Sequence, residues 1–92
     1  MSIEIRDKNG FLRTNYEEDN NIPHGYWENY YPNGNLSRKG YYDKGKPVGE
    51  WFTYWENGNI MFIGSFNDLT PIGKWLWYHP DNDVITGKEF YL

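Results

Sequence analysis

The sequence predicts an all-β protein, an elongated antiparallel meander of stacked β-hairpins in a single twisted sheet. The phrases "YYPNGNLSRKGYY" (30–42) and "YWENGNIMFIGSF" (54–66) repeat the same order of tyrosine, Asn-Gly-Asn, aliphatic residue and glycine, 24 residues apart. Asn-Gly between runs of aromatic and β-branched residues is the strongest short-range hairpin signal. No stretch of adequate length has a hydrophobic period of 3.6 residues, so we expect no helix.

The period of 24 residues divides the chain into four units. Residues 25–48 and 49–72 are identical at 8 of 24 positions without a gap. Residues 1–24 follow the period weakly and form a degenerate cap unit, and residues 73–92 form a truncated repeat. We therefore expect a single repeat domain over 1–92. About eight strands at roughly 4.8 Å spacing would span on the order of 35 Å. The recurring columns are Gly25/Gly49/Gly73, Trp27/Trp51/Trp75 and Tyr30/Tyr54/Tyr78.

The hairpin turns define a strand register. We expect two-residue turns in which both residues have positive φ. This register pairs Trp51 with Gly64 and Trp55 with Ile60, and an indole opposite a glycine can cover the bare backbone. The expected turns lie at Asn9-Gly10, Asn33-Gly34 and Asn57-Gly58 and near Asp81-Asn82. The expected structural residues are Trp27, Gly40, Trp51, Gly64 and Trp75, with Trp27 paired with Gly40 and Tyr31 with Leu36.

The fourth unit departs from this pattern. Trp75 and Gly87 are one residue closer in sequence than Trp51 and Gly64. We expect a wider loop at "HPDND" (79–83) to accommodate the difference.

Composition excludes several classes of function. The 92 residues contain no cysteine, so disulfides and thiolate metal sites are excluded and a reducing, cytoplasmic location is expected. The net charge of −4 disfavours binding to nucleic acid or to an anionic membrane surface. The first twenty residues contain no apolar run, so no leader or membrane span is expected. We also expect no metal site and no cofactor.

The repeated phrase is similar to a known motif. "GYWENYYPNGNLSRKGYY", "GEWFTYWENGNIMFIGSF" and the looser "GKWLWYHPDNDVITGKEF" resemble the MORN repeat in its bacterial variant form, over residues 25–90. The resemblance implies elongated sheets of stacked hairpins that act as scaffolds for protein interaction, without catalytic residues. Short stand-alone bacterial members of the family are catalogued as YwqK-type antitoxins. This chain departs from the motif at Asn82, where the family has glycine.

Alternation of side chains places a contrast on the face opposite the tryptophans. Glu4, Arg6, Glu28 and Lys39 lie at one end of that face, whereas the third and fourth units contribute apolar residues. A single-layer sheet leaves such residues exposed, and contiguous apolar surface usually marks a contact site. A protein partner, a second copy of the chain as a homodimer, or the segment "KEFYL" (88–92) is expected to cover it. The predicted partner-binding residues are Phe52, Tyr54, Met61, Ile63, Leu76 and Tyr78.

An enzyme and a small-ligand binding module are the two functions that compete with protein binding. His24 and His79 fall in loops at different phases of the repeat, and no Ser-His-Asp arrangement is encoded, so we expect no enzyme. A binding module for a carbohydrate, a nucleotide or a quaternary ammonium group is the alternative, with Trp55 and Trp77 as its ligand-binding residues. The acidic run "YEEDNN" (16–21) would steer a basic partner.

Overall fold

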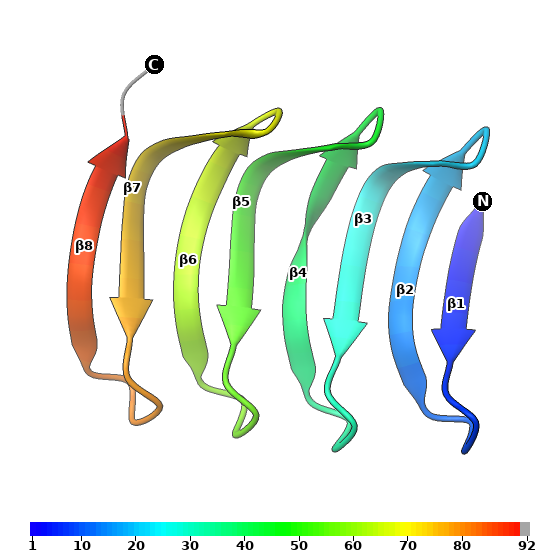
Figure 1. Cartoon of the computed structure of the whole chain (residues 1–92), viewed down its shortest axis with the longest axis horizontal. Helices are drawn as coiled ribbons and strands as arrows, with labels where there is room; N and C mark the ends of the chain where they lie inside the picture. The colour runs from blue at the N-terminus through cyan, green and yellow to red at the C-terminus, as the bar shows by residue number, and fades with distance from the viewer. Residues whose placement is uncertain (91–92) are drawn as a thin grey trace.

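The computed structural model of the chain describes residues 1–90, which form one antiparallel sheet (Figure 1). Within these residues eight strands follow one another as a meander and no helix occurs, so the predicted fold class is confirmed. The sheet measures 37 × 31 × 12 Å, and its shortest dimension is the thickness of a single layer. The strands are β1 (Ser2–Arg6), β2 (Leu12–Asp19), β3 (Ile22–Tyr30), β4 (Leu36–Asp43), β5 (Lys46–Tyr54), β6 (Ile60–Asn67), β7 (Thr70–Tyr78) and β8 (Val84–Phe90).

The hairpin turns lie where the sequence predicted them, but they have three-residue loops. In the second hairpin the Tyr31 amide donates to the Asn35 carbonyl at 2.8 Å, and the Gly34 amide donates to the Tyr31 carbonyl at 2.9 Å. Gly34 has a φ of +90°, whereas Asn33 does not have a positive φ. This is a type I turn followed by a glycine in the left-handed region. Pro32 suits its first central position because the ring holds φ near −65°.

The longer loop shifts the register near each hairpin tip. Trp51 pairs with Gly64 as predicted, but Tyr54 pairs with Ile60, where Trp55 had been predicted. The second hairpin behaves in the same way: Trp27 pairs with Gly40 as predicted, and Tyr30 replaces Tyr31 as the partner of Leu36. An irregularity in the ladder between Thr53 and Tyr54 absorbs the extra residue.

The fourth hairpin closes with a loop of the same size, so the prediction of a wider loop is wrong. The His79 amide donates to the Asp83 carbonyl at 2.7 Å, and the Asn82 amide donates to the His79 carbonyl at 2.9 Å. Asn82 takes the place of the turn glycine with a φ of +77°, which asparagine tolerates better than most residues.

The last strand also keeps the register of the other repeats. Trp75 pairs with Lys88, and Leu76 pairs with Gly87. Lys88 therefore occupies the column that holds Gly64 in the preceding unit, and Gly87 lies one residue before it. The apparent shortening came from matching the wrong glycine.

The first two connections between repeats use the two-residue turns that had been predicted for Asn-Gly, whereas in the third only Asp68 has a positive φ. Asn20 and Asn21 have φ values of 53° and 67°, and Lys44 and Gly45 have values of 52° and 86°. Each pair links strands that meet directly, as in the pairing of Asp43 with Lys46. Figure 1 shows the upper ends of β3, β5 and β7 running sideways before they turn down the sheet.

The core consists of tryptophans packed on glycines of the preceding repeat. A Cβ atom built on Gly40 would lie 2.1 Å from the Trp51 ring, and one built on Gly64 would lie 2.2 Å from the Trp75 ring. The side chains of Trp51 and Trp75 are only 5% and 7% exposed. The indole that covers each glycine thus comes from the next repeat and not from the hairpin partner, which corrects the prediction and explains how adjacent repeats lock together.

Trp27 lacks such a glycine. The residue in the corresponding column of β2 is Tyr16, whose ring lies 4.5 Å from the Trp27 ring in a tilted arrangement. The Trp27 indole N–H donates to Asn29 Oδ1 at 3.0 Å, and its side chain remains half-buried. The first tryptophan therefore packs on an aromatic ring of the cap unit instead of on bare backbone.

An asparagine ladder joins successive hairpin tips. The side-chain amides of Asn33 and Asn35 both donate to the Glu56 carbonyl, at 2.9 and 2.8 Å. One repeat later, Asn57 and Asn59 both donate to the Pro80 carbonyl, at 2.9 and 2.7 Å. Asp81 and Asp83 occupy these positions in the last unit, beyond which residues 1–90 contain no further repeat.

The ladder makes a stability prediction with a built-in control. Asn57→Asp replaces an amide donor by a carboxylate that faces the Pro80 carbonyl, while its Oδ1 can still accept from the Asn59 amide. We expect a loss of about 1 kcal/mol in the free energy of unfolding, measured by urea titration. Asp81→Asn makes the reverse change at the end of the ladder and should leave stability within about 0.5 kcal/mol. Equal effects would show that the ladder does not join the repeats.

Candidate interaction surface

One row of paired residues crosses the whole sheet on the face opposite the tryptophans. Each member pairs in register with the next, so the row runs perpendicular to the strands from β1 to β8. We call it the transverse row. It consists of Glu4, Asn15, Glu28, Lys39, Phe52, Ile63, Leu76 and Gly87. Its first half is polar or charged, and its second half is apolar.

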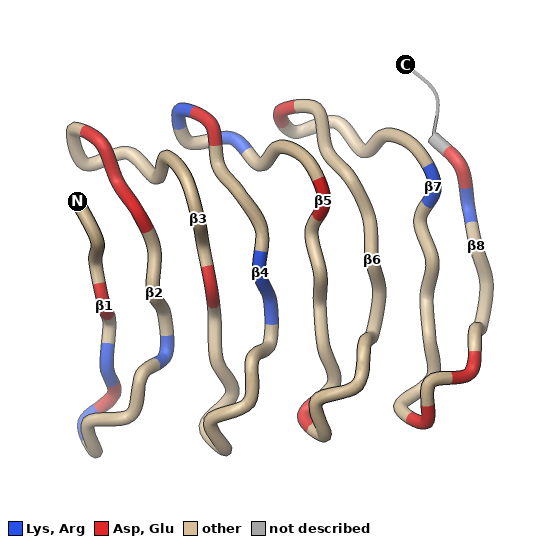
Figure 2. Tube along the Cα trace, turned by 180° about the vertical axis from the view of Figure 1, so that it is seen from behind, with Lys and Arg blue, Asp and Glu red and all other residues tan. Residues whose placement is uncertain are grey.

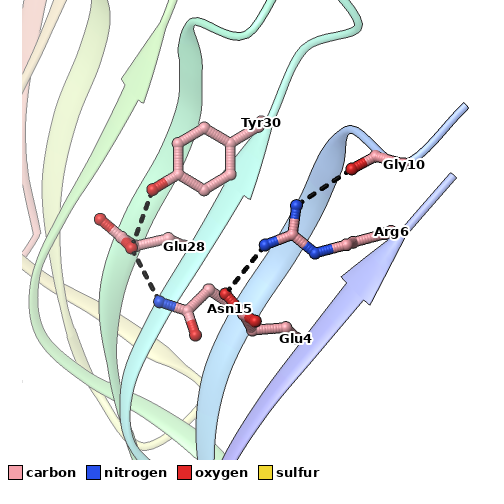
Figure 3. A network of polar contacts seen from close by, with 6 residues as sticks. All are labelled: Glu4, Arg6, Gly10, Asn15, Glu28 and Tyr30. Carbon is pink, nitrogen blue, oxygen red and sulfur yellow. Dashed lines mark hydrogen bonds and ion pairs between the residues drawn. The ribbon is translucent and has the colours of Figure 1, made fainter.

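The polar half is organised around Glu28 (Figure 3). The phenols of Tyr26 and Tyr30 donate to the two carboxylate oxygens at 2.8 and 2.9 Å, and the Asn15 amide donates at 3.2 Å. Three donors hold the carboxylate in one orientation and occupy most of its acceptor positions. Nearby, Arg6 contacts the Glu4 carboxylate at 3.4 Å.

Burial and Glu28 together keep these phenols protonated. Desolvation by burial, followed by the hydrogen bond and the charge of Glu28, raises the pKa of Tyr26 to about 12. The same causes raise the pKa of Tyr30. A phenol is already protonated at neutral pH, and the raised pKa values extend this donor state to higher pH, so the polar half is a preorganised structural network.

Lys39 marks the boundary between the two halves. Its Nζ lies 5.1 Å from the centroid of the Phe52 ring, within the range of a cation–π contact. The charged head thus remains at the surface while the side chain covers part of the ring. Beyond this point charge is sparse: Figure 2 shows β6 without any charged residue.

The apolar half consists of Phe52, Ile63 and Leu76 on three adjacent strands. All three side chains are only partly buried, because residues 1–90 form one layer and supply no second layer over this face. Residues 88–90 continue β8 along the edge of β7 and do not fold over the row; residues 91–92 of the predicted covering segment lie outside the described residues.

The other predicted partner-binding residues lie outside the row. Tyr54 and Tyr78 are two residues further along β5 and β7, half-buried, and pair with Ile60 and Val84. Met61 lines a shallow groove at the hairpin tips, together with Tyr31, Trp55, Glu56, Asn57 and Pro80. The structure therefore brings three of the six predicted residues directly together.

The two tryptophans predicted for ligand binding belong to different clusters. The Trp55 indole N–H donates to the Tyr78 carbonyl at 3.2 Å, a contact that joins two repeats. Trp77 stacks on Trp75 with ring centroids 5.9 Å apart and also contacts Phe62. They do not form one site.

The polar loop residues show structural contacts. His24 Nδ1 accepts a hydrogen bond from the Lys44 amide at 3.1 Å and lies 3.6 Å from the half-exposed Asp43 carboxylate. In the described part of the chain no cluster of three or more His, Cys, Asp and Glu side chains could hold a metal ion. Residues 1–90 also contain no helix long and apolar enough to cross a membrane.

The sequence did not predict a groove on the tryptophan face. It has a volume of about 290 Å³ and contains the buried rings of Trp51 and Trp75. Arg38 is its one charged residue and stands in the column of Thr14, Phe62 and Thr86, so a charge in an otherwise uncharged column is the signal that could have indicated the groove. The lining residues are Arg38, Tyr42, Pro47, Trp51, Thr53, Phe62, Phe66 and Trp75.

Comparison with known proteins identifies the repeats. The family described as MORN repeat variant matches twice, over residues 23–46 and 47–68, which together make up half of the chain. No curated protein and no solved structure matches the chain. Repeats of this family are in general modules for interaction with proteins or membranes. With its 24-residue period, its glycine-packed tryptophans and these two matches, the chain belongs to the MORN repeat variant family.

Proposed function

We propose that this chain is a non-enzymatic, cytoplasmic protein-binding module that occupies and blocks a partner protein, as an antitoxin or inhibitor does. The observation that supports the proposal is the apolar half of the transverse row. Phe52, Ile63 and Leu76 lie side by side on a face that no other part of residues 1–90 covers. Adjacent apolar side chains that stay partly exposed in this way usually mark a contact surface.

The fold separates this surface from the residues that stabilise the sheet. Trp51 and Trp75 lie on the face opposite the row, where they pack on glycines and form the buried core. The row is therefore free to bind a partner without repacking the interior. Phe52 supplies an aromatic anchor of the type enriched at interface cores, and Lys39 and Glu50 provide a polar rim beside it.

Charge favours a basic protein as the partner. The chain carries a net charge of −4, and Glu17, Glu18 and Asp19 follow one another along β2. Opposite charges on the two molecules raise the rate of encounter at low salt, while the apolar contact sets the lifetime of the complex. The same net charge disfavours an anionic membrane as the binding surface.

Ile63→Glu tests the proposal directly. A carboxylate in the middle of the apolar half should abolish partner binding, whereas the melting temperature should change little because Ile63 is not in the buried core. Ile5→Glu is the matched control: it makes the same change at an isoleucine that is 49% exposed on β1. Affinity capture from the source cells, compared quantitatively between the two variants, would identify the proteins lost only with Ile63→Glu.

Self-association is the competing outcome, and sedimentation analysis of the purified chain detects it. A wild-type dimer that Ile63→Glu converts to a monomer would place a second copy on the row. The proposal is contradicted if the wild type is monomeric and both variants capture the same proteins in the same amounts. It is also contradicted if Ile63→Glu unfolds the chain, since the row would then be core.

A further inference from the structure

The groove on the tryptophan face is built from aromatic rings. The Tyr42 ring meets the Trp51 ring edge-on at 5.1 Å, and the Phe66 ring meets the Trp75 ring edge-on at 5.1 Å. The Phe62 ring stacks on the Trp75 ring, with the two ring centroids 5.8 Å apart. The volume of about 290 Å³ is at the lower end for ligand sites, which suits a small molecule with a flat apolar body.

Two residues that line this groove carry hydrogen-bond donors without an acceptor among residues 1–90. Trp51 is only 5% exposed, and its Nε1 has no hydrogen-bond partner among the described residues. The indole nitrogens of Trp27, Trp55 and Trp75, by contrast, all donate to oxygen atoms. A buried donor without an acceptor is unusual, but this nitrogen is closed off from solvent, so a ligand in the groove does not reach it.

Arg38 is the second donor. It pairs in register with Thr53 and lines the groove, and within residues 1–90 its exposed guanidinium forms no hydrogen bond or ion pair. Thr53 is only 8% exposed, so the register places the Arg38 backbone beside a buried part of the sheet. The positive charge in an otherwise uncharged lining selects for an anion.

These features discriminate between ligand classes. A quaternary ammonium group would be repelled by Arg38, and a sugar would require more polar side chains than this lining provides. A nucleotide carries more negative charge than one guanidinium neutralises. A single carboxylate, in contrast, matches the one guanidinium, which can donate two parallel hydrogen bonds to it.

We propose that the groove binds a small arylalkyl carboxylate, with its ring against the aromatic lining and its carboxylate on Arg38. This site lies on the face opposite the transverse row and is independent of partner binding there. The carboxylate would pair with Arg38, and the ring would cover the apolar lining.

The test uses the full chain and two isosteric probes, 3-phenylpropionate and the neutral 3-phenylpropanamide. Titration followed by ¹H–¹⁵N NMR monitors the five indole N–H signals, with that of Trp51 assigned from Trp51→Phe. We expect the acid to bind roughly tenfold more tightly than the amide, since hydrogen bonds to charged groups contribute about that much. The Trp51 indole signal should shift, because the Trp51 ring lines the groove.

Arg38→Gln should abolish the preference for the acid, and Arg6→Gln, on the first strand, should preserve it. Arg38 is exposed, so its substitution is not expected to unfold the chain, and the comparison of acid with amide on the wild type needs no variant. Equal binding of the two probes, no saturable binding at millimolar concentration, or a preference that survives Arg38→Gln would each overturn the proposal.

Discussion

Trp51→Ala is expected to lower the free energy of unfolding by about 3–5 kcal/mol, as large aromatic truncations in a core do. Trp51 is 5% exposed, packs on Gly40 of the preceding repeat and meets the Tyr42 ring edge-on. Its removal would leave both contacts empty at the centre of the sheet. For a domain of 92 residues this loss is a large part of the total stability, and urea titration measures it.

Trp55→Ala provides the comparison for this result. Trp55 is only partly buried and donates one hydrogen bond to the Tyr78 carbonyl. We expect a loss of about 1–2 kcal/mol. If both substitutions cost the same, Trp51 is not the centre of the core and the repeats are held together in another way.

Gly40→Ala is expected to cost about 3 kcal/mol, at the upper end for overpacking. The new Cβ atom would lie 2.1 Å from the Trp51 ring, so the indole would have to lift off the strand. Gly87→Ala is the matched control because Gly87 is also a strand glycine without a positive φ, and its nearest neighbour, Leu76 Cδ2, would be at 3.2 Å. That change should cost less than about 1 kcal/mol.

A double-mutant cycle shows whether the two residues act together. In the Trp51→Ala background the space above Gly40 is free, so Gly40→Ala should become nearly neutral. Additive losses would contradict the contact between neighbouring repeats.

Most of the fold could be predicted from the sequence because the residues of each repeat specify a hairpin by themselves. The period of 24 residues, the turn positions and the pairing of Trp51 with Gly64 all follow from residue types and alternation. The type of hairpin loop did not follow from residue types in this way, because Asn-Gly suits both a two-residue turn and the end of a three-residue turn. Pro32, which favours the first central position of a type I turn, was the signal for the second choice.

Contacts between repeats were harder to predict. The pairing of Trp51 with Gly64 is correct, yet the Trp51 ring leans toward Gly40 on the other side, and alternation alone cannot give the direction of a side chain along the sheet. The same limit hid the groove beside Arg38, which depends on how rings from four strands approach one another.

The predicted contact surface shows the same division. The row from Lys39 through Phe52 to Leu76 follows from register, which is set well inside the hairpins. Met61 was placed with it because the extra loop residue, which alters the ladder close to the tips, was not foreseen. Residues far from the turns were therefore predicted more accurately than residues next to them.

The central claim is that the apolar half of the transverse row is exposed in the free chain and covered by a protein partner. The chain contains no cysteine, so Ile63→Cys introduces a single reactive thiol, and Ile5→Cys is the control. We predict that a maleimide reagent labels both thiols rapidly in the free chain, and that the captured partner slows labelling at position 63 by roughly tenfold or more while leaving position 5 unaffected. Labelling at position 63 that is already slow in the free monomer, or that the partner does not change, would contradict the account.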